Sequence, residues 1–215
     1  MTSLLEIILV LLALSNLFLL GSTRIATYIR IVAFQGIILG ALPFIDPQGG
    51  AEHTRTWVLA VGNAGLKGVL FPWILFRVLR TVKIKREVEP FVGYGASLVL
   101  GTLALVLAFW LASALPVTAR THSSLVIPVS FFTIFSGLFI IVSRKKALTQ
   151  VLGFLVLENG IFALGNVLVG EIPVLVELGV LLDAFVADFV MGIAVYRIRQ
   201  EFNHMDASRL NTLKG

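Results

Sequence analysis

Five ionisable side chains lie inside apolar stretches that are long enough to cross a membrane: Lys67, Glu158, Glu177, Asp183 and Asp188. A charged group at the centre of a bilayer costs roughly 2.5–3.5 kcal/mol on insertion scales, so such groups are usually functional. Lysine, glutamate and aspartate can all gain or lose a proton. The pattern therefore predicts a proton or ion path built from side chains that change charge.

Lys67 lies near the middle of the stretch Trp57–Leu79. At the rise of an α-helix it is about 15 Å from the nearer end. Asn63 lies one turn earlier on the same helix face and is a secondary candidate, and Pro72 predicts a bend. Three small residues that would let a neighbouring helix approach surround the lysine, namely Gly62, Gly65 and Gly68. Lys67 is either a residue that takes up and releases a proton or a structural partner of a carboxylate on another helix.

Glu158 lies in the short polar sequence Leu157–Gly160 within an apolar stretch. Asn159 and Asn166 are seven residues apart and share a helix face, and Glu158 lies beside that face. A polar stripe at this depth must face protein or water, because lipid cannot satisfy it. It is either part of an ion path, with Asn159 as a secondary candidate, or a hydrogen-bonded anchor between helices.

The last apolar stretch, Ile172–Tyr196, carries three acidic residues. Glu177 and Asp188 are eleven residues apart and share a face of the predicted helix, whereas Asp183 points in another direction. Asp183 and Asp188 join Lys67 and Glu158 as candidates for a proton relay. Glu177 is a secondary candidate, since it lies near the outer surface where water could solvate it.

The elements that must position these groups are seven predicted membrane-spanning helices. An apolar stretch of about 17–25 residues is enough to cross a bilayer. The stretches are Leu4–Leu20, Ile25–Ile45, Trp57–Leu79, Val92–Leu115, Leu125–Val142, Gln150–Val169 and Ile172–Tyr196. We therefore predict an all-α membrane protein with one transmembrane domain over residues 1–196. Five helices occupy 1–142, a helix pair occupies 144–196, and 197–215 form a tail.

The basic residues predict the orientation of these helices. Of the 17 lysines and arginines, 14 fall at one side of the predicted membrane, two at the other, and Lys67 within it. By the positive-inside rule the N-terminus lies outside and the tail lies in the cytoplasm, as in a multi-pass protein of the inner (cytoplasmic) membrane. Arg144, Lys145 and Lys146 are interpreted as topology determinants. Leu4–Leu20 is interpreted as a retained span, because no basic residue precedes it.

Composition excludes several other functions. The chain is 58% hydrophobic, with a mean hydropathy of +0.97, well above a soluble domain. It has no cysteine and only three histidines, all predicted in loops or the tail, and no phosphate-binding loop or nucleophile elbow. We expect no metal, no cofactor and no nucleic-acid partner, and contact with membrane lipid.

Several segments resemble a known family. The sequence Gly153–Gly160, the following Leu175–Gly179 and Asp183–Phe185, and the ending Asp206–Gly215 resemble component E of hydrogenase-4, a membrane subunit of the second formate hydrogenlyase type. The last spans are also similar to the K-type subunit of respiratory complex I and to the C subunit of multisubunit cation/proton antiporters. The segment from Lys67 to Pro72 resembles the lysine–proline segment of the large antiporter-like subunits.

The resemblance implies a non-catalytic membrane-arm subunit of a group 4 nickel–iron hydrogenase or a related oxidoreductase complex. Such a complex couples redox chemistry in peripheral nickel–iron and iron–sulfur subunits to proton or sodium translocation through antiporter-like membrane subunits. Glu158 matches the first of two relay carboxylates in the K-type subunit, and Asp183 and Asp188 both fit the second. The alternatives are a subunit of a multisubunit antiporter, a transporter acting alone, and a purely structural docking subunit.

Overall fold

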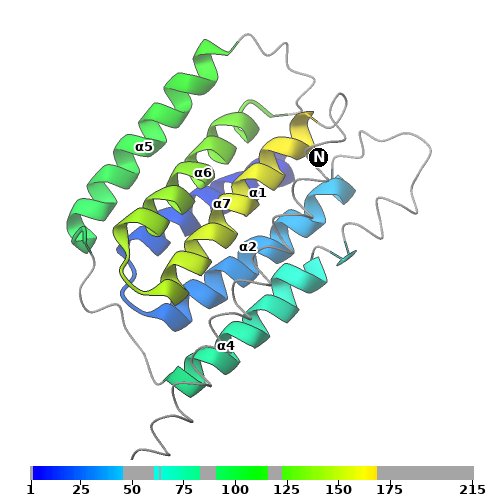
Figure 1. Ribbon diagram of the computed structural model, residues 1–215. Coiled ribbons are helices and arrows are strands. Elements are labelled where there is room, and N and C mark those ends of the chain that lie inside the picture. Colours follow the sequence, from blue (N-terminus) through cyan, green and yellow to red (C-terminus); the bar gives the residue numbers. More distant parts are fainter. Residues whose placement is uncertain (1, 46–60, 63, 83–90, 116–122, 169–215) are drawn as a thin grey trace, which may run out of the picture.

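The computed structural model describes residues 2–45, 61–62, 64–82, 91–115 and 123–168, and their regular structure is helical (Figure 1). The helices are α1 (Thr2–Gly21), α2 (Ile25–Ile45), a π-helical turn η1 (Leu66–Leu70) that continues into α4 (Phe71–Val82), α5 (Tyr94–Ala114), α6 (Val126–Ser143) and α7 (Ala147–Leu168). Each of the first six predicted spans has a counterpart among them. The seventh span, Ile172–Tyr196, and the tail lie outside the described residues.

The described helices have the length and composition of membrane spans. Within the described residues α1, α5, α6 and α7 are each long and apolar enough to cross a bilayer, and α2 carries a shorter apolar segment, Ile25–Gly40. Their outward side chains are largely apolar, as lipid requires. The all-helical membrane class is thereby confirmed, whereas the total of seven spans and the orientation remain predictions.

The closest packing in the described bundle is between the antiparallel helices α6 and α7. Three glycines allow it. A Cβ at Gly160 would lie 2.7 Å from the Ile134 nitrogen, and one at Gly153 would lie 2.8 Å from Ile140 Cγ2. A Cβ at Gly137 would collide with the backbone of the facing helix. Small residues here bring two helix backbones into direct contact, as is common in membranes.

Two apolar clusters fill the bundle, one towards each end. One contains the end of α1, the start of α2, α4 and the α6–α7 turn, with Leu20, Ile25, Leu75 and Ile140 among its members. The other contains the start of α1 and of α6, together with Leu39 of α2 and Ala163 of α7. Asn16 of α1, Gln35 of α2, and Glu158 and Asn159 of α7 are buried polar residues that lie in sequence between the residues that these helices give to the two clusters. The interior therefore has an apolar–polar–apolar order along its length.

Arg144 joins three elements at the α6–α7 turn, a role that the sequence did not indicate, whereas its role in setting the topology remains a prediction. Its side chain is fully buried. Its Nη2 donates to the Leu20 carbonyl at the end of α1 over 2.9 Å, and its Nη1 donates to the Val92 carbonyl just before α5 over 3.3 Å. The guanidinium also lies 4.7 Å from the centre of the Tyr94 ring. An arginine at a helix C-terminus is favoured by the helix dipole.

The helix ends that carry basic residues gather at one end of the bundle. Figure 1 shows the α1–α2 and α6–α7 turns at the same end, together with the start of α5 and the end of α4. A backbone hydrogen bond of 2.9 Å from the Phe91 nitrogen to the Ser143 carbonyl fixes the start of α5 there. This agrees with the predicted grouping of basic residues; which side of the membrane this end faces remains a prediction.

Candidate functional site: a buried lysine–glutamate pair in a polar layer

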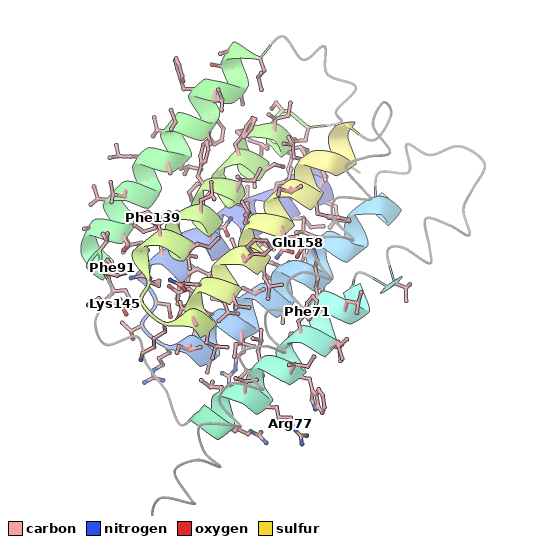
Figure 2. The ribbon with its side chains drawn as sticks, in the orientation of Figure 1. Phe71, Arg77, Phe91, Phe139, Lys145 and Glu158 are labelled. Atoms are coloured by element: carbon pink, nitrogen blue, oxygen red, sulfur yellow. The ribbon has the colours of Figure 1, made fainter. Side chains whose placement is uncertain are left out.

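Lys67 and Glu158 form an ion pair in the interior of the bundle. Lys67 Nζ lies 2.6 Å from Glu158 Oε1, and the two side chains are 4% and 1% exposed. Glu158 points inward from the middle of α7 (Figure 2). The two residues are far apart in sequence and come from different helices. Lys67 thus has a carboxylate partner on another helix, as one of the two predictions for this residue required. The partner, Glu158, is itself a candidate relay residue.

A π-helical turn places Lys67 at this position. Within Leu66–Leu70 the helix is wound more widely, and the Phe71 nitrogen bonds the Leu66 carbonyl five residues back. Pro72 follows at once and has no backbone N–H to donate. Single π-helical turns occur mostly inside α-helices and frequently at functional sites. The sequence predicted a bend near Pro72 but not the π-helical winding.

Close contact with α2 holds the lysine in place. A Cβ at Gly36 would lie only 2.6 Å from Lys67 Cβ, and one at Gly68 would lie 2.5 Å from Ile37 Cγ1. The two glycines therefore allow the π-helical turn to pack directly on α2. Of the three glycines near Lys67 in sequence, Gly68 is thus the one that admits a neighbour among the described residues, and for the other two this remains a prediction. A Cβ at Gly62 or Gly65 would meet nothing described within 4 Å.

A chain of hydrogen bonds crosses the bundle beside the ion pair. Asn159 Nδ2 donates to Gln35 Oε1 over 3.3 Å, and Gln35 Nε2 donates to Ser15 Oγ over 2.7 Å and to Asn16 Oδ1 over 2.9 Å. Asn16 Nδ2 then donates to Thr133 Oγ1 over 2.8 Å. We call Ser15, Asn16, Gln35, Thr133 and Asn159 the polar layer. It links α1, α2, α6 and α7.

The ion pair and the polar layer meet on α2. Gln35 bonds Asn159, and the next residue, Gly36, packs on Lys67, which bonds Glu158. Two adjacent residues of α2 are thus connected to two adjacent residues of α7: Gln35 bonds Asn159 directly, and Gly36 contacts Lys67, which pairs with Glu158. The Phe162 ring, one turn further along α7, lies 5.6 Å from Lys67 Nζ and adds a cation–π contact.

The two side chains of the ion pair carry opposite charges, so together they add no net charge to the interior. The lysine and the glutamate neutralise each other at 2.6 Å. Removing two charges from water is costly, and an apolar pair of similar volume is often as stable or more so. The presence of this buried ion pair is therefore weak evidence that the two residues serve only to stabilise the fold.

Four predicted site residues lie outside the described residues: Asn63, Glu177, Asp183 and Asp188. Whether the last helix brings its carboxylates to Glu158 therefore remains a prediction. Asn166 lies in α7, but its side chain is not described. Among the described residues there is no group of three or more histidine, aspartate or glutamate side chains that could hold a metal ion.

The sequence reasoning missed four members of the polar layer: Ser15, Asn16, Gln35 and Thr133. A signal was present, because Asn16 and Gln35 are amide side chains inside otherwise apolar spans, and an amide in lipid must find a partner. Serine and threonine give no such signal, since they can bond their own helix. Thr133 does so, donating to the Val129 carbonyl over 2.8 Å.

The fold and the site define a multi-pass helical membrane protein with a buried charge pair in a polar layer. The chain is 29% identical over 206 residues to an uncharacterized protein of Mycobacterium tuberculosis, covering 94% of this chain and 92% of that protein. It is 27% identical over 151 residues to Hydrogenase-4 component E of Escherichia coli K12, covering 69% of each chain. Hydrogenase-4 component E of Shigella flexneri matches equally well. No protein-family model and no solved structure matches the chain.

Proposed function

We propose that this protein is a membrane subunit of a hydrogenase-related complex, in which Lys67 and Glu158 form part of a relay that moves protons, or sodium ions, across the membrane. The observation that carries the proposal is the buried ion pair at 2.6 Å between two helices. The similarity to Hydrogenase-4 component E supports the kind of complex. The redox chemistry would belong to partner subunits, since this chain offers no cysteine ligands for an iron–sulfur cluster.

The relay would work by coupled titration. Two ionisable groups in contact take up and release protons as a pair, because the charge of one changes the proton affinity of the other. In a low-dielectric interior this interaction is strong. A conformational change that separates Lys67 from Glu158 would release a proton from one group and attract one to the other. Asp183 and Asp188 are the proposed continuation of the relay.

The experiment compares Glu158→Gln with Glu6→Gln, the same replacement at an exposed position of α1. The tagged chain is purified from membranes in mild detergent, its accompanying subunits are identified by mass spectrometry, and proton movement in membrane vesicles is measured per assembled complex. We expect hydrogenase and antiporter-like subunits to co-purify. Glu158→Gln should lose proton movement, whereas Glu6→Gln should keep it. A Glu158→Gln complex that moves protons normally would refute the relay, and a chain that purifies without such subunits would refute the complex.

A purely structural docking role is the second candidate. A buried ion pair can fix which helices meet, and the three close glycine contacts of α6 and α7 show a tightly packed scaffold. Under that role, Glu158→Gln would lower the amount of assembled complex, and the complexes that do assemble would translocate normally.

A further inference from the structure

The polar layer fixes the orientation of its amide side chains. Its far end is the Val129 carbonyl, which can only accept a hydrogen bond. The Thr133 hydroxyl donates to that carbonyl, so its oxygen accepts from Asn16 Nδ2. The other end of the Asn16 amide, Oδ1, then accepts from Gln35 Nε2 at 2.9 Å. Each step follows from the one before, because an amide that donates through its nitrogen must present its oxygen on the other side.

Gln35 in turn fixes Asn159. The second hydrogen of Gln35 Nε2 goes to Ser15 Oγ over 2.7 Å, and the Ser15 hydroxyl is itself committed to the Leu12 carbonyl. Only Gln35 Oε1 is left to face Asn159, and it accepts from Asn159 Nδ2 at 3.3 Å. Turning the Asn159 amide over would set two oxygens against each other. Asn159 Oδ1 is therefore held as an acceptor directed away from Gln35.

This acceptor is buried and lacks a donor. Asn159 is 1% exposed, and its Oδ1 has no hydrogen-bond partner among the described residues. A buried polar atom without a partner costs about 1–3 kcal/mol, so native proteins seldom leave one. The position lies next to Glu158 along α7. Asn159 Oδ1 therefore needs a molecule that donates a hydrogen bond to it.

A second such atom faces the same stretch from α6. Ser136 is 1% exposed, and its Oγ also has no hydrogen-bond partner among the described residues. Its neighbour Gly137 packs on Leu157, which places Ser136 at the level of Glu158 along the facing helix. Ser130, two turns earlier, instead donates to the carbonyl four residues back, over 2.7 Å. Ser136 is thus a hydroxyl in this interface that is open to another partner.

We propose that Asn159 Oδ1 holds an internal water molecule beside the Lys67–Glu158 pair, and that this water is the proton carrier of the relay; the second part rests on the proposed function. The acceptor needs a donor, and water binds where two to four polar groups are within reach. A sodium ion would bring a charge that the balanced ion pair does not offset. The amides of the polar layer neither gain nor lose protons under ordinary conditions, so they can hold a proton carrier but cannot replace it.

The direct test is electron cryomicroscopy of the intact membrane assembly at a resolution that shows water. We expect density at about 2.7–3.2 Å from Asn159 Oδ1, in hydrogen-bonding geometry. The same density should be present in sodium-free buffer. Density that disappears without sodium would identify a cation and overturn the proposal, as would a protein side chain seated against Oδ1.

The functional test compares Asn159→Leu with Ser130→Ala. Both remove a buried polar side chain, but the Ser130 hydroxyl donates to a carbonyl of its own helix, whereas Asn159 bonds Gln35 of α2. Asn159→Leu should lower proton movement per assembled complex about tenfold or more, as expected for one lost hydrogen bond to the carrier. Ser130→Ala should not change it. Equal effects would mean that Asn159 is merely structural, and an unchanged rate in Asn159→Leu together with a lost rate in Glu158→Gln would refute the water site while leaving the relay intact.

Discussion

A double-mutant cycle on Lys67 and Glu158 separates the ion pair's effect on stability from its effect on function. Each side chain is less than 5% exposed, and the two meet at 2.6 Å. Removing one partner of a buried pair leaves an uncompensated charge and costs about 3–5 kcal/mol. Glu158→Leu and Lys67→Met should therefore each lose a large part of the roughly 5–15 kcal/mol that stabilises a typical protein.

The double variant should behave differently. With both charges replaced by apolar side chains of similar size, no buried charge is left unpaired, and stability should return to about the wild-type value or exceed it by about 1–4 kcal/mol. The interaction energy of the cycle would then be several kcal/mol, larger than the roughly 0.5–3 kcal/mol usual for residues in contact. The measurement is unfolding by sodium dodecyl sulfate in mixed micelles, on the protein purified with its accompanying subunits.

Two results would refute this reasoning. If the single variants lose less than about 1 kcal/mol each, the pair does not carry the charge interaction that the geometry indicates. If the double variant is stable, assembles and still moves protons, the pair is dispensable for transport and the relay is wrong. A stable double variant that has lost proton movement is the expected outcome.

Two further predictions concern the scaffold around the site. Gly137→Ala should lower stability by about 1–3 kcal/mol, because its Cβ collides with the α7 backbone. Gly95→Ala, whose Cβ meets no described residue within 4 Å, should be neutral or slightly stabilising in the same unfolding measurement. A neutral Gly137→Ala would mean that α6 and α7 are not in backbone contact. Arg144→Met should cost about 1.5–3 kcal/mol or more, through the loss of two charged hydrogen bonds to backbone carbonyls, while Lys145→Met, at an exposed neighbour, should change stability by less than about 1 kcal/mol. Similar effects of the two replacements would contradict a joining role for Arg144.

The sequence by itself determined the class of protein and three members of the site, Lys67, Glu158 and Asn159. Runs of apolar residues as long as Leu4–Leu20 and Ile25–Ile45 can satisfy their backbone in lipid only as helices, so the helix positions follow from composition. Lys67 and Glu158 were identifiable because an ionisable group in such a run is too costly to be incidental. Neither inference requires knowing which helices are neighbours.

Only the tertiary structure decided which groups meet. Spacing along one helix says nothing about the partner on another, so it left open whether Lys67 had a carboxylate and which one. The π-helical turn depends on local winding around Pro72 and on packing against Gly36, so the hydropathy of the sequence does not indicate it. The same holds for the polar layer. An amide such as Gln35 inside an apolar span indicates that a polar partner is needed, but only the fold shows that its partners come from two other helices, α1 and α7.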